Sequence, residues 1–176
     1  MRIDRNKTAA LVIDYQEKLV PVMHKKKKLI QNSGILLAGL RVLEIPMVVT
    51  QQYTKGLGMT VGELTDVMGT TEYVDKISFS AYECVKKQIK GKKFIIICGI
   101  EAHICVLQTV LDLIAQGYVP VVVEDCVSSR KGNDRKVALQ RMRDEGAIVT
   151  TYESVLFELL QVAGTEESKR VQRLIK

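Results

Sequence analysis

Short apolar runs, separated by longer and more polar stretches, set the pattern of the chain. The run Thr8–Asp14, TAALVID, does not alternate with polar residues, as expected of a strand buried on both faces. Further apolar runs predict five more strands, at Met47–Thr50, Tyr73–Ile77, Lys93–Ile100, Val119–Glu124 and Ala147–Thr150. The pattern therefore predicts about six strands spread along the whole chain.

The segments between these runs have the spacing of helices. In Lys25–Leu43 the apolar residues recur near helical spacing, and Pro46 ends the segment. Further helices are predicted at Ala81–Lys90, Ala102–Gln116, Asn133–Asp144, Ser154–Ala163 and in the charged tail 165–176. Alternating strands and helices indicate a three-layer α/β/α, Rossmann-like domain over residues 1–176. It has a roughly six-stranded parallel sheet with helices on both faces.

One long stretch, residues 51–71, has no regular pattern. Its glycines and threonines are typical of a loop with a short helical piece. Long loops in compact domains often have functional roles, and this one follows the carboxyl end of a predicted strand. We expect it to line a pocket, because ligands bind at that edge of open α/β sheets.

A candidate nucleophile lies where the fourth apolar run passes into a helix. The strand ends near Gly99, and the sharp turn after it delivers Cys105 into the first turn of the next helix. A helix N-terminus carries partial positive charge, so a thiol there is expected to ionise more easily and become a nucleophile. A buried packing role is the alternative, because free cysteines are often small core residues.

Composition and charge narrow the function classes. The chain has 176 residues, a 47% apolar content and a net charge of +6. The positive charge gathers at Lys25–Lys28, Lys86–Lys93 and Lys169–Lys176 without interleaved aromatic residues, which favours a solvated surface over nucleic-acid binding. No apolar run approaches the roughly 20 residues of a membrane span, and the glycine-rich nucleotide motifs are absent.

The cysteines and the first residues bear on the compartment. Four cysteines, at positions 84, 98, 105 and 126, form no C-x-x-C pair, so neither a zinc knuckle nor a disulfide framework is indicated. The first residues lack the apolar region and cleavage site of a signal peptide. We therefore expect reduced thiols and a cytoplasmic location.

Three segments together resemble a known family. They are TAALVIDYQ with Asp14, YVDKISFSAY with Lys76, and ICGIEAHICVLQTVLDLIAQGYVPVVVEDCVSSR with Cys105. At this spacing they resemble the isochorismatase-like cysteine hydrolase superfamily. The loop QQYTKGLGMTVGEL further resembles its branch of isochorismatase domain-containing proteins, whose substrates are largely undefined.

The resemblance implies a catalytic triad of Asp14, Lys76 and Cys105. Cys105 would attack an amide carbonyl to form a thioester, with Asp14 as the proton carrier and Lys76 holding Asp14. The resemblance also implies a cis peptide bond between Ile100 and Glu101. The backbone N–H groups of Glu101 and Cys105 would then form an oxyanion hole.

The departures from the family are also informative. True isochorismatases lack a cysteine at the position of Cys105, so the family name does not give the activity. Nicotinamidases of this superfamily carry an Asp-x-His metal motif where this chain reads QQYTKGLG, and the only histidines here are His24 and His103. We therefore expect no metal site and no cofactor.

Four residues are candidates for substrate binding. Gln16 either lines the pocket or caps the next helix, and Tyr53 and Phe79 are either pocket walls or, by default, core residues. His103 either lines the pocket or has a capping or surface role. Cys84, Cys98 and Cys126 are expected to be packing residues.

The sequence leaves rival functions open. The first is a metal-independent cysteine hydrolase of a small amide or related C–N substrate, which the intact triad favours. The second is a non-catalytic scaffold or interaction protein that retains the fold, and nucleic-acid processing is supported only by the net charge. Members of the family assemble into dimers and larger rings, so the resemblance implies a homo-oligomer.

Overall fold

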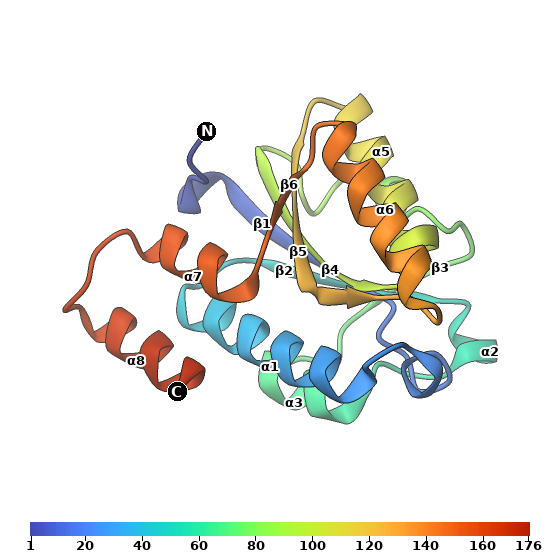
Figure 1. Ribbon diagram of the computed structural model, residues 1–176, viewed down its shortest axis with the longest axis horizontal. Helices are drawn as coiled ribbons and strands as arrows, with labels where there is room; N and C mark the ends of the chain where they lie inside the picture. Colours follow the sequence, from blue (N-terminus) through green and yellow to red (C-terminus); the bar gives the residue numbers. More distant parts are fainter.

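A parallel sheet forms the middle of three layers in the computed structural model, which describes residues 1–176 (Figure 1). The six strands lie in the order β3-β2-β1-β4-β5-β6, and every neighbouring pair is parallel. They are β1 (Thr8–Ile13), β2 (Met47–Gln52), β3 (Val74–Lys76), β4 (Phe94–Ile100), β5 (Val119–Ser128) and β6 (Ile148–Thr150). The strand order reverses between β1 and β4. In doubly wound sheets this switch point is where ligands bind.

Strand β1 shows why its sequence does not alternate. All six of its residues are buried. Ala10 and Val12 pack into the core on one face of the sheet, whereas Leu11 and Ile13 pack into the core on the other face. A strand covered on both sides needs apolar side chains at every position, which confirms the prediction of a sheet between two helical layers.

Helices cover the two faces of the sheet (Figure 1). One layer contains α1 (Lys26–Val42), α3 (Gly62–Met68), α7 (Tyr152–Leu160) and α8 (Glu166–Ile175). The other contains α4 (Tyr82–Val85), the π-helical turn η3 (Ala102–Val106), α5 (Leu107–Ala115) and α6 (Gly132–Asp144). Shorter pieces are η1 (Arg5–Lys7), η2 (Val20–Val22) and α2 (Thr54–Leu57). None of these helices is both long and apolar enough to cross a membrane.

Several elements differ from the sequence-based expectation. Strand β2 runs to Gln52 instead of ending at Thr50. Strand β5 runs on to Ser128 instead of ending at Glu124, because Val127 and Ser128 pair with the end of β4 after a shift in register. Helix α4 stops at Val85, where like-charged lysines begin, and like charges one turn apart destabilise a helix. The helix expected from Ala102 starts as the π-helical turn η3.

Candidate active site

Asp14 follows β1 directly at the switch point of the sheet. Its side chain is fully buried, and its backbone has a left-handed φ of 54°. Thr50, near the end of the neighbouring strand β2, donates a hydrogen bond of 2.8 Å from Oγ1 to Asp14 Oδ1. The carboxylate is therefore fixed in position at the carboxyl-terminal edge of the sheet.

Lys76 brings a buried positive charge to this carboxylate. It ends β3, two strands away from β1, and is 3% exposed. Its Nζ lies 2.8 Å from Asp14 Oδ2 and donates to Gln52 Oε1 at 2.7 Å. It also donates to the backbone oxygens of Ser78 at 3.2 Å and Phe79 at 3.0 Å. Protein oxygens surround the ammonium, which suits it to act as a fixed charge.

One oxygen of this pair has an incomplete set of partners. Asp14 Oδ2 touches the Lys76 ammonium, but the contact lacks hydrogen-bond geometry and no other group donates to the atom. The two groups still form an ion pair, because a 2.8 Å approach of opposite charges is attractive whatever its angle. Oδ2 is thus a buried acceptor that is open to a further donor.

Cys105 supplies a thiol beside this pair. It lies in η3, immediately after β4, and is 6% exposed. Its backbone oxygen accepts a 2.7 Å hydrogen bond from Thr109 Oγ1, which in turn accepts one from the N–H of Ala81. The negative charge of Asp14 and the positive charge of Lys76 both act on the buried thiol. The structure therefore brings together the three residues that the resemblance had singled out.

The expected easy ionisation of Cys105 is wrong for the free protein. Burial, followed by the negative charge of Asp14, raises the pKa of the Cys105 thiol to about 12, and Lys76 opposes this only in part. Desolvation disfavours the charged form of any thiol. At neutral pH the thiol is therefore protonated.

The turn between β4 and Cys105 is tightly packed. Gly99 has a φ of 138°, and a Cβ there would lie 2.2 Å from the backbone oxygen of Ile13. The next peptide bond, Ile100–Glu101, is cis, as the resemblance implied. The Glu101 carboxylate accepts hydrogen bonds from the N–H of Arg130 at 3.0 Å and from its Nε at 3.2 Å. These contacts tie the turn to the residues after β5.

Gln16 serves the scaffold around the site. It is fully buried, and its Nε2 donates to the backbone oxygens of Gln52 at 2.9 Å and Gly58 at 2.8 Å. Its Oε1 accepts from the N–H of Gln52 at 2.7 Å. These bonds engage both ends of the amide, so the side chain joins the end of β2 to the following loop.

Tyr53 and Phe79 lie on the surface near Lys76. Tyr53 is 51% exposed and Phe79 is 53% exposed, so the default expectation that they are core residues is wrong. The N–H of Tyr53 donates to the backbone oxygen of Lys76, and the backbone oxygen of Phe79 accepts from its ammonium. Both rings are therefore carried by backbone that contacts the site.

His103 joins the turn that carries Cys105 to the neighbouring strand and helix. Its Nδ1 lies 2.9 Å from Ser129 Oγ, just after β5, and its Nε2 lies 4.0 Å from Asp134 Oδ2 on α6. The imidazole is only partly exposed between these partners. This geometry fits an anchor for η3, a role that the sequence did not suggest.

Two polar residues of the site were missed by sequence reasoning. Thr50 holds Asp14, and Gln52 holds Lys76 through Oε1 while its Nε2 donates to the backbone oxygen of Ile77. A signal was present, because these polar residues follow the apolar start of β2 at the same edge as Asp14. The sequence reading assigned Gln52 to a loop and so overlooked it.

The donor set around the site favours acid–base chemistry over metal binding. It consists of one carboxylate, one ammonium and one thiol. Nowhere does the structure bring together three or more histidine, cysteine, aspartate or glutamate side chains as a group that could hold a metal. Independence from metals remains a prediction.

Comparison with known proteins places the chain in a family. Residues 8–154 match the family model described as isochorismatase domain. The chain belongs to the isochorismatase family. This finding and the parallel α/β sheet confirm the resemblance drawn from the three sequence segments and the fold it implied.

Similar proteins carry different descriptions. Isochorismatase domain-containing protein 2 of Danio rerio is 38% identical over 178 residues, covering 99% of this chain and 89% of that protein. A solved structure described as MAR1 ribonuclease from Caenorhabditis elegans has 38% identity and a TM-score of 0.94, covering 99% of this chain and 92% of that one. The YcaC gene product of Escherichia coli, described as an octameric hydrolase of unknown specificity, has 28% identity and a TM-score of 0.86, covering 92% and 83%.

Proposed function

We propose that this protein is a metal-independent cysteine hydrolase, formed as one domain over residues 1–176, that acts on a small amide or related C–N substrate. The observation that carries the proposal is Asp14 Oδ2, a buried acceptor without a hydrogen-bond donor. It lies beside the positive charge of Lys76 and a protonated thiol. Family membership supports hydrolase chemistry in general.

The proposed reaction has two halves. In the first, Cys105 Sγ attacks the amide carbonyl carbon while its proton passes to Asp14 Oδ2. The C–N bond then breaks, Asp14 returns the proton to the departing amine, and a thioester remains on Cys105. In the second half, water attacks the thioester carbonyl carbon while one of its protons passes to Asp14. The carboxylic acid leaves, and the thiol recovers its proton.

The other groups would stabilise charge without transferring protons. Lys76 is surrounded by oxygen acceptors and would keep Asp14 in place while lowering the energy of the developing thiolate. The N–H groups of Glu101 and Cys105 would face the oxyanion. Loss of one donor of this kind typically costs on the order of 10²–10³ in rate. Tyr53 and Phe79, exposed beside Lys76, would contact the apolar part of the substrate.

The test is a library of small amides assayed for amine release, with the parent and Cys105→Ala compared on every active substrate. We expect the substitution to lower turnover by at least about three orders of magnitude. Cys84→Ala is the matched control, because Cys84 is a half-buried thiol outside the triad. It should retain activity.

Intact-mass measurement during turnover tests the covalent step separately. An acyl adduct should form on the parent and on Cys84→Ala but not on Cys105→Ala. Turnover that survives the loss of Cys105 would overturn the mechanism. A parent that hydrolyses no amide in a broad library would favour the non-catalytic scaffold.

A second candidate is RNA cleavage, favoured by the similar Caenorhabditis elegans structure described as a ribonuclease and by the net charge of +6. Its test is incubation with end-labelled single-stranded RNA, using Cys105→Ala and Asp14→Asn purified in parallel to expose contaminating nucleases. Cleavage by the parent that both variants lose would establish this activity. Equal cleavage by all three proteins would reject it.

Assembly and location are further parts of the proposal. The octameric E. coli relative supports a homo-oligomer, so light scattering should give a multiple of the 19.7 kDa chain mass. A monomer would contradict this. The four free cysteines support a cytoplasmic location, which cell fractionation would check.

A further inference from the structure

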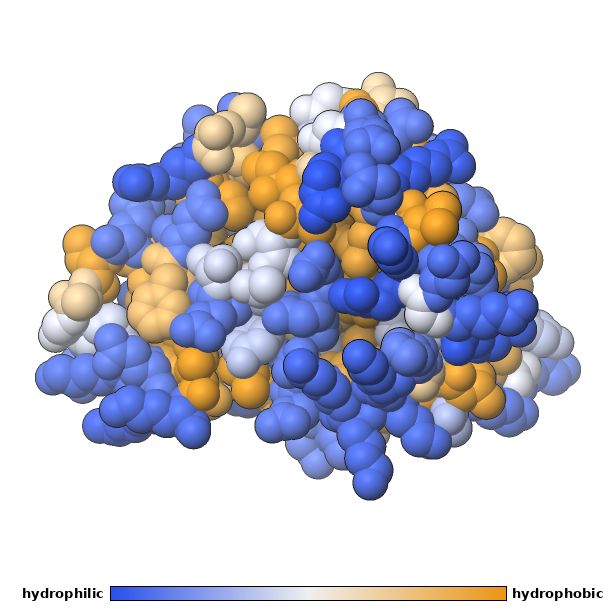
Figure 2. Space-filling model, viewed as in Figure 1, coloured by the Kyte–Doolittle hydropathy of each residue, from blue (hydrophilic) through white to orange (hydrophobic).

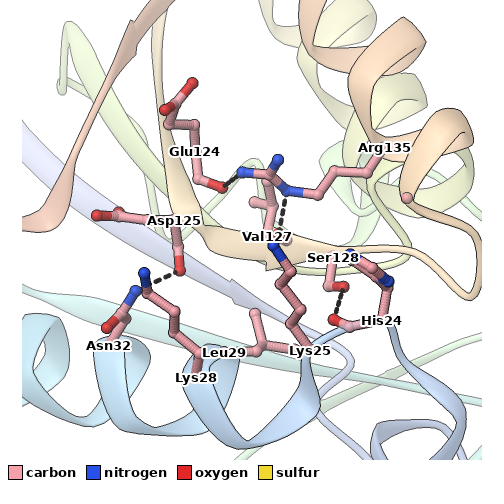
Figure 3. A pocket seen from close by; sticks show the side chains of 11 residues that line it. His24, Lys25, Lys28, Leu29, Asn32, Glu124, Asp125, Val127, Ser128 and Arg135 are labelled. Carbon is pink, nitrogen blue, oxygen red and sulfur yellow. Dashed lines mark hydrogen bonds between the residues drawn. The ribbon is translucent and has the colours of Figure 1, made fainter.

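A cavity separate from the Cys105 site lies at the same edge of the sheet. It has a volume of about 280 Å³ and is formed by the beginnings of α1 and α6 and the end of β5 (Figure 3). The residues that matter for its chemistry are Lys25, Lys28, Asn32, Asp125 and Arg135. None of the triad residues lines it. No part of the proposed hydrolysis uses this space.

Two free cations line the α1 side of the cavity. Lys25 and Lys28 are one helical turn apart, and in Figure 3 both side chains extend from the helix toward β5. Neither ammonium forms an ion pair. The surface over the beginning of α1 is hydrophilic in Figure 2. These charges are therefore available to an anion that enters the cavity.

The nearby carboxylates do not neutralise these lysines. In Figure 3 the carboxylates of Glu124 and Asp125 point away from the two ammonium groups, and Asp125 Oδ1 accepts the N–H of Tyr152 at 3.0 Å. Arg135 adds a third, fixed cation. Its Nε donates to the backbone oxygen of Val127 at 2.9 Å, and its Nη2 donates to that of Glu124. The lining is thus positive where the three cations face it.

The start of α1 strengthens this preference for an anion. The helix is 17 residues long, its N-cap Lys25 makes no side-chain cap, and its first turn contains no acidic residue. The N–H groups of its first turn have no acceptor. Such groups, with the partial positive charge of the helix end, favour a phosphate-like ligand.

A buried amide beside the cations points to a second feature of the ligand. Asn32 lines the cavity and is 6% exposed. Its Nδ2 donates to the backbone oxygen of Asp125 at 3.1 Å, while no group donates to its Oδ1. Asn32 Oδ1 is not among the buried side-chain atoms that lack a partner, so it is reached by solvent and is open to a donor that enters the cavity. A ligand hydroxyl would supply that donor.

We propose that this cavity binds the phosphate group of a small phosphorylated polyol. The phosphate would lie between Lys25, Lys28 and the first turn of α1, and a hydroxyl would donate to Asn32 Oδ1. A volume of about 280 Å³ suits a small ligand and is below the roughly 300–1,000 Å³ of drug-sized pockets. Inorganic phosphate shares the anionic half of this chemistry, so the experiment must separate the two.

Isothermal titration of the full-length protein tests the site with three probes: ribose 5-phosphate, inorganic phosphate and ribose. We expect ribose 5-phosphate to bind at least tenfold more tightly than inorganic phosphate, and ribose to give no heat. Lys25→Gln and Lys28→Gln should each weaken the phosphate ester at least fivefold. The matched control is Lys27→Gln, which removes an equal charge from the same turn but outside the cavity lining. It should change the affinity less than twofold.

Three results would overturn the proposal. Equal weakening by all three lysine substitutions would mean a diffuse basic surface of the kind that attracts RNA. Equal affinity for inorganic phosphate and the ester would remove the polyol part. Absence of binding at millimolar ribose 5-phosphate, with unchanged thermal unfolding of every variant, would remove the site itself.

Discussion

An ion pair lies at each end of strand β1. The two pairs have the same N–O distance but differ in how far their side chains are exposed to solvent. Before the strand, Arg5 Nη1 lies 2.8 Å from Glu167 Oε2, with side chains 29% and 39% exposed. After the strand, Lys76 Nζ lies 2.8 Å from Asp14 Oδ2, with side chains 1% and 0% exposed. The first pair fastens α8 to the start of the chain, and the second forms the candidate active site.

The two ion pairs differ in their contact with water. Water and salt screen the exposed pair, so its two charges interact weakly and each is satisfied without the other. The buried pair has lost its hydration and depends on its partners, Thr50 and Gln52 among them. A buried charge that remains open on one oxygen is costly for stability, which makes it a functional candidate.

The largest effect should follow from breaking the buried pair. Lys76→Met leaves the Asp14 charge buried without its cation, and we expect a loss of about 3–5 kcal/mol in the free energy of unfolding. Urea unfolding measures it. Adding Asp14→Asn to this variant should recover part of the loss, because the uncompensated charge is then gone.

Lys86→Met is the matched control for this comparison. Lys86 pairs with Glu83 at 2.7 Å on the exposed surface, close to the site in sequence. Its removal should leave the unfolding midpoint unchanged. If Lys76→Met were equally harmless, or the double variant no more stable than the single, the Asp14 charge would not depend on Lys76 for its stability.

The sequence predicted the backbone of this site better than its electrostatics. Cys105 was found because it follows an apolar run at the carboxyl edge of a parallel sheet, a relation that local pattern contains. Asp14 and Lys76 came from the resemblance. Thr50 and Gln52 depend on pairing across neighbouring strands, and the pKa of Cys105 depends on how deeply its turn packs. Neither the pairing between strands nor the depth of packing can be inferred from residues that are close in sequence.

The next largest effect concerns the reactivity of the thiol. With a pKa of about 12, Cys105 should react with iodoacetamide at pH 7 on the order of a thousandfold more slowly than an ordinary thiol of pKa about 8.5. Its rate should rise about tenfold for each unit of pH up to pH 10. Asp14→Asn should speed labelling, because the Asp14 charge is one cause of the raised pKa.

Mass-spectrometric mapping of each cysteine measures these rates separately. Urea-unfolded protein is the control, since all four thiols should then label alike. Rapid labelling of native Cys105 at pH 7, or a rate independent of pH, would mean that a thiolate already exists in the free protein. Asp14 would then not be needed as the base in the first step.

A smaller effect should follow from loosening the scaffold around the buried end of β1. Gln16→Ala removes three hydrogen bonds and takes these partners from the buried backbone of Gln52 and the partly buried oxygen of Gly58, which should cost about 2–3 kcal/mol. Gln140→Ala is the control, because that exposed side chain bonds only to Asp144 and should change stability by less than about 0.5 kcal/mol. Equal losses in urea unfolding would contradict the scaffold role.

The smallest effect belongs to the exposed end of β1, and its pH dependence has a definite sign. The hydrogen bond and charge of Arg5 lower the pKa of Glu167. A carboxyl with a lowered folded-state pKa stabilises the fold above its ordinary pKa, about 4.3, and loses that contribution as pH falls through the folded value. Glu167→Gln should therefore cost at most about 1 kcal/mol at pH 7 in low salt. The cost should vanish in strong acid.

Added salt should change the unfolding free energies of the two variants differently, so one urea-unfolding series distinguishes the two ion pairs. In 1 M sodium chloride the Debye length is about 3 Å, so the stability difference between the parent and Glu167→Gln should largely disappear. The loss caused by Lys76→Met should persist, because no salt reaches a pair that is 1% and 0% exposed. If salt erased both differences, the Asp14–Lys76 pair would be open to solvent, and the contrast between the two ends of β1 would fail. If salt erased neither, the Arg5–Glu167 pair would be buried in solution and would join α8 to the core more firmly than its exposure indicates.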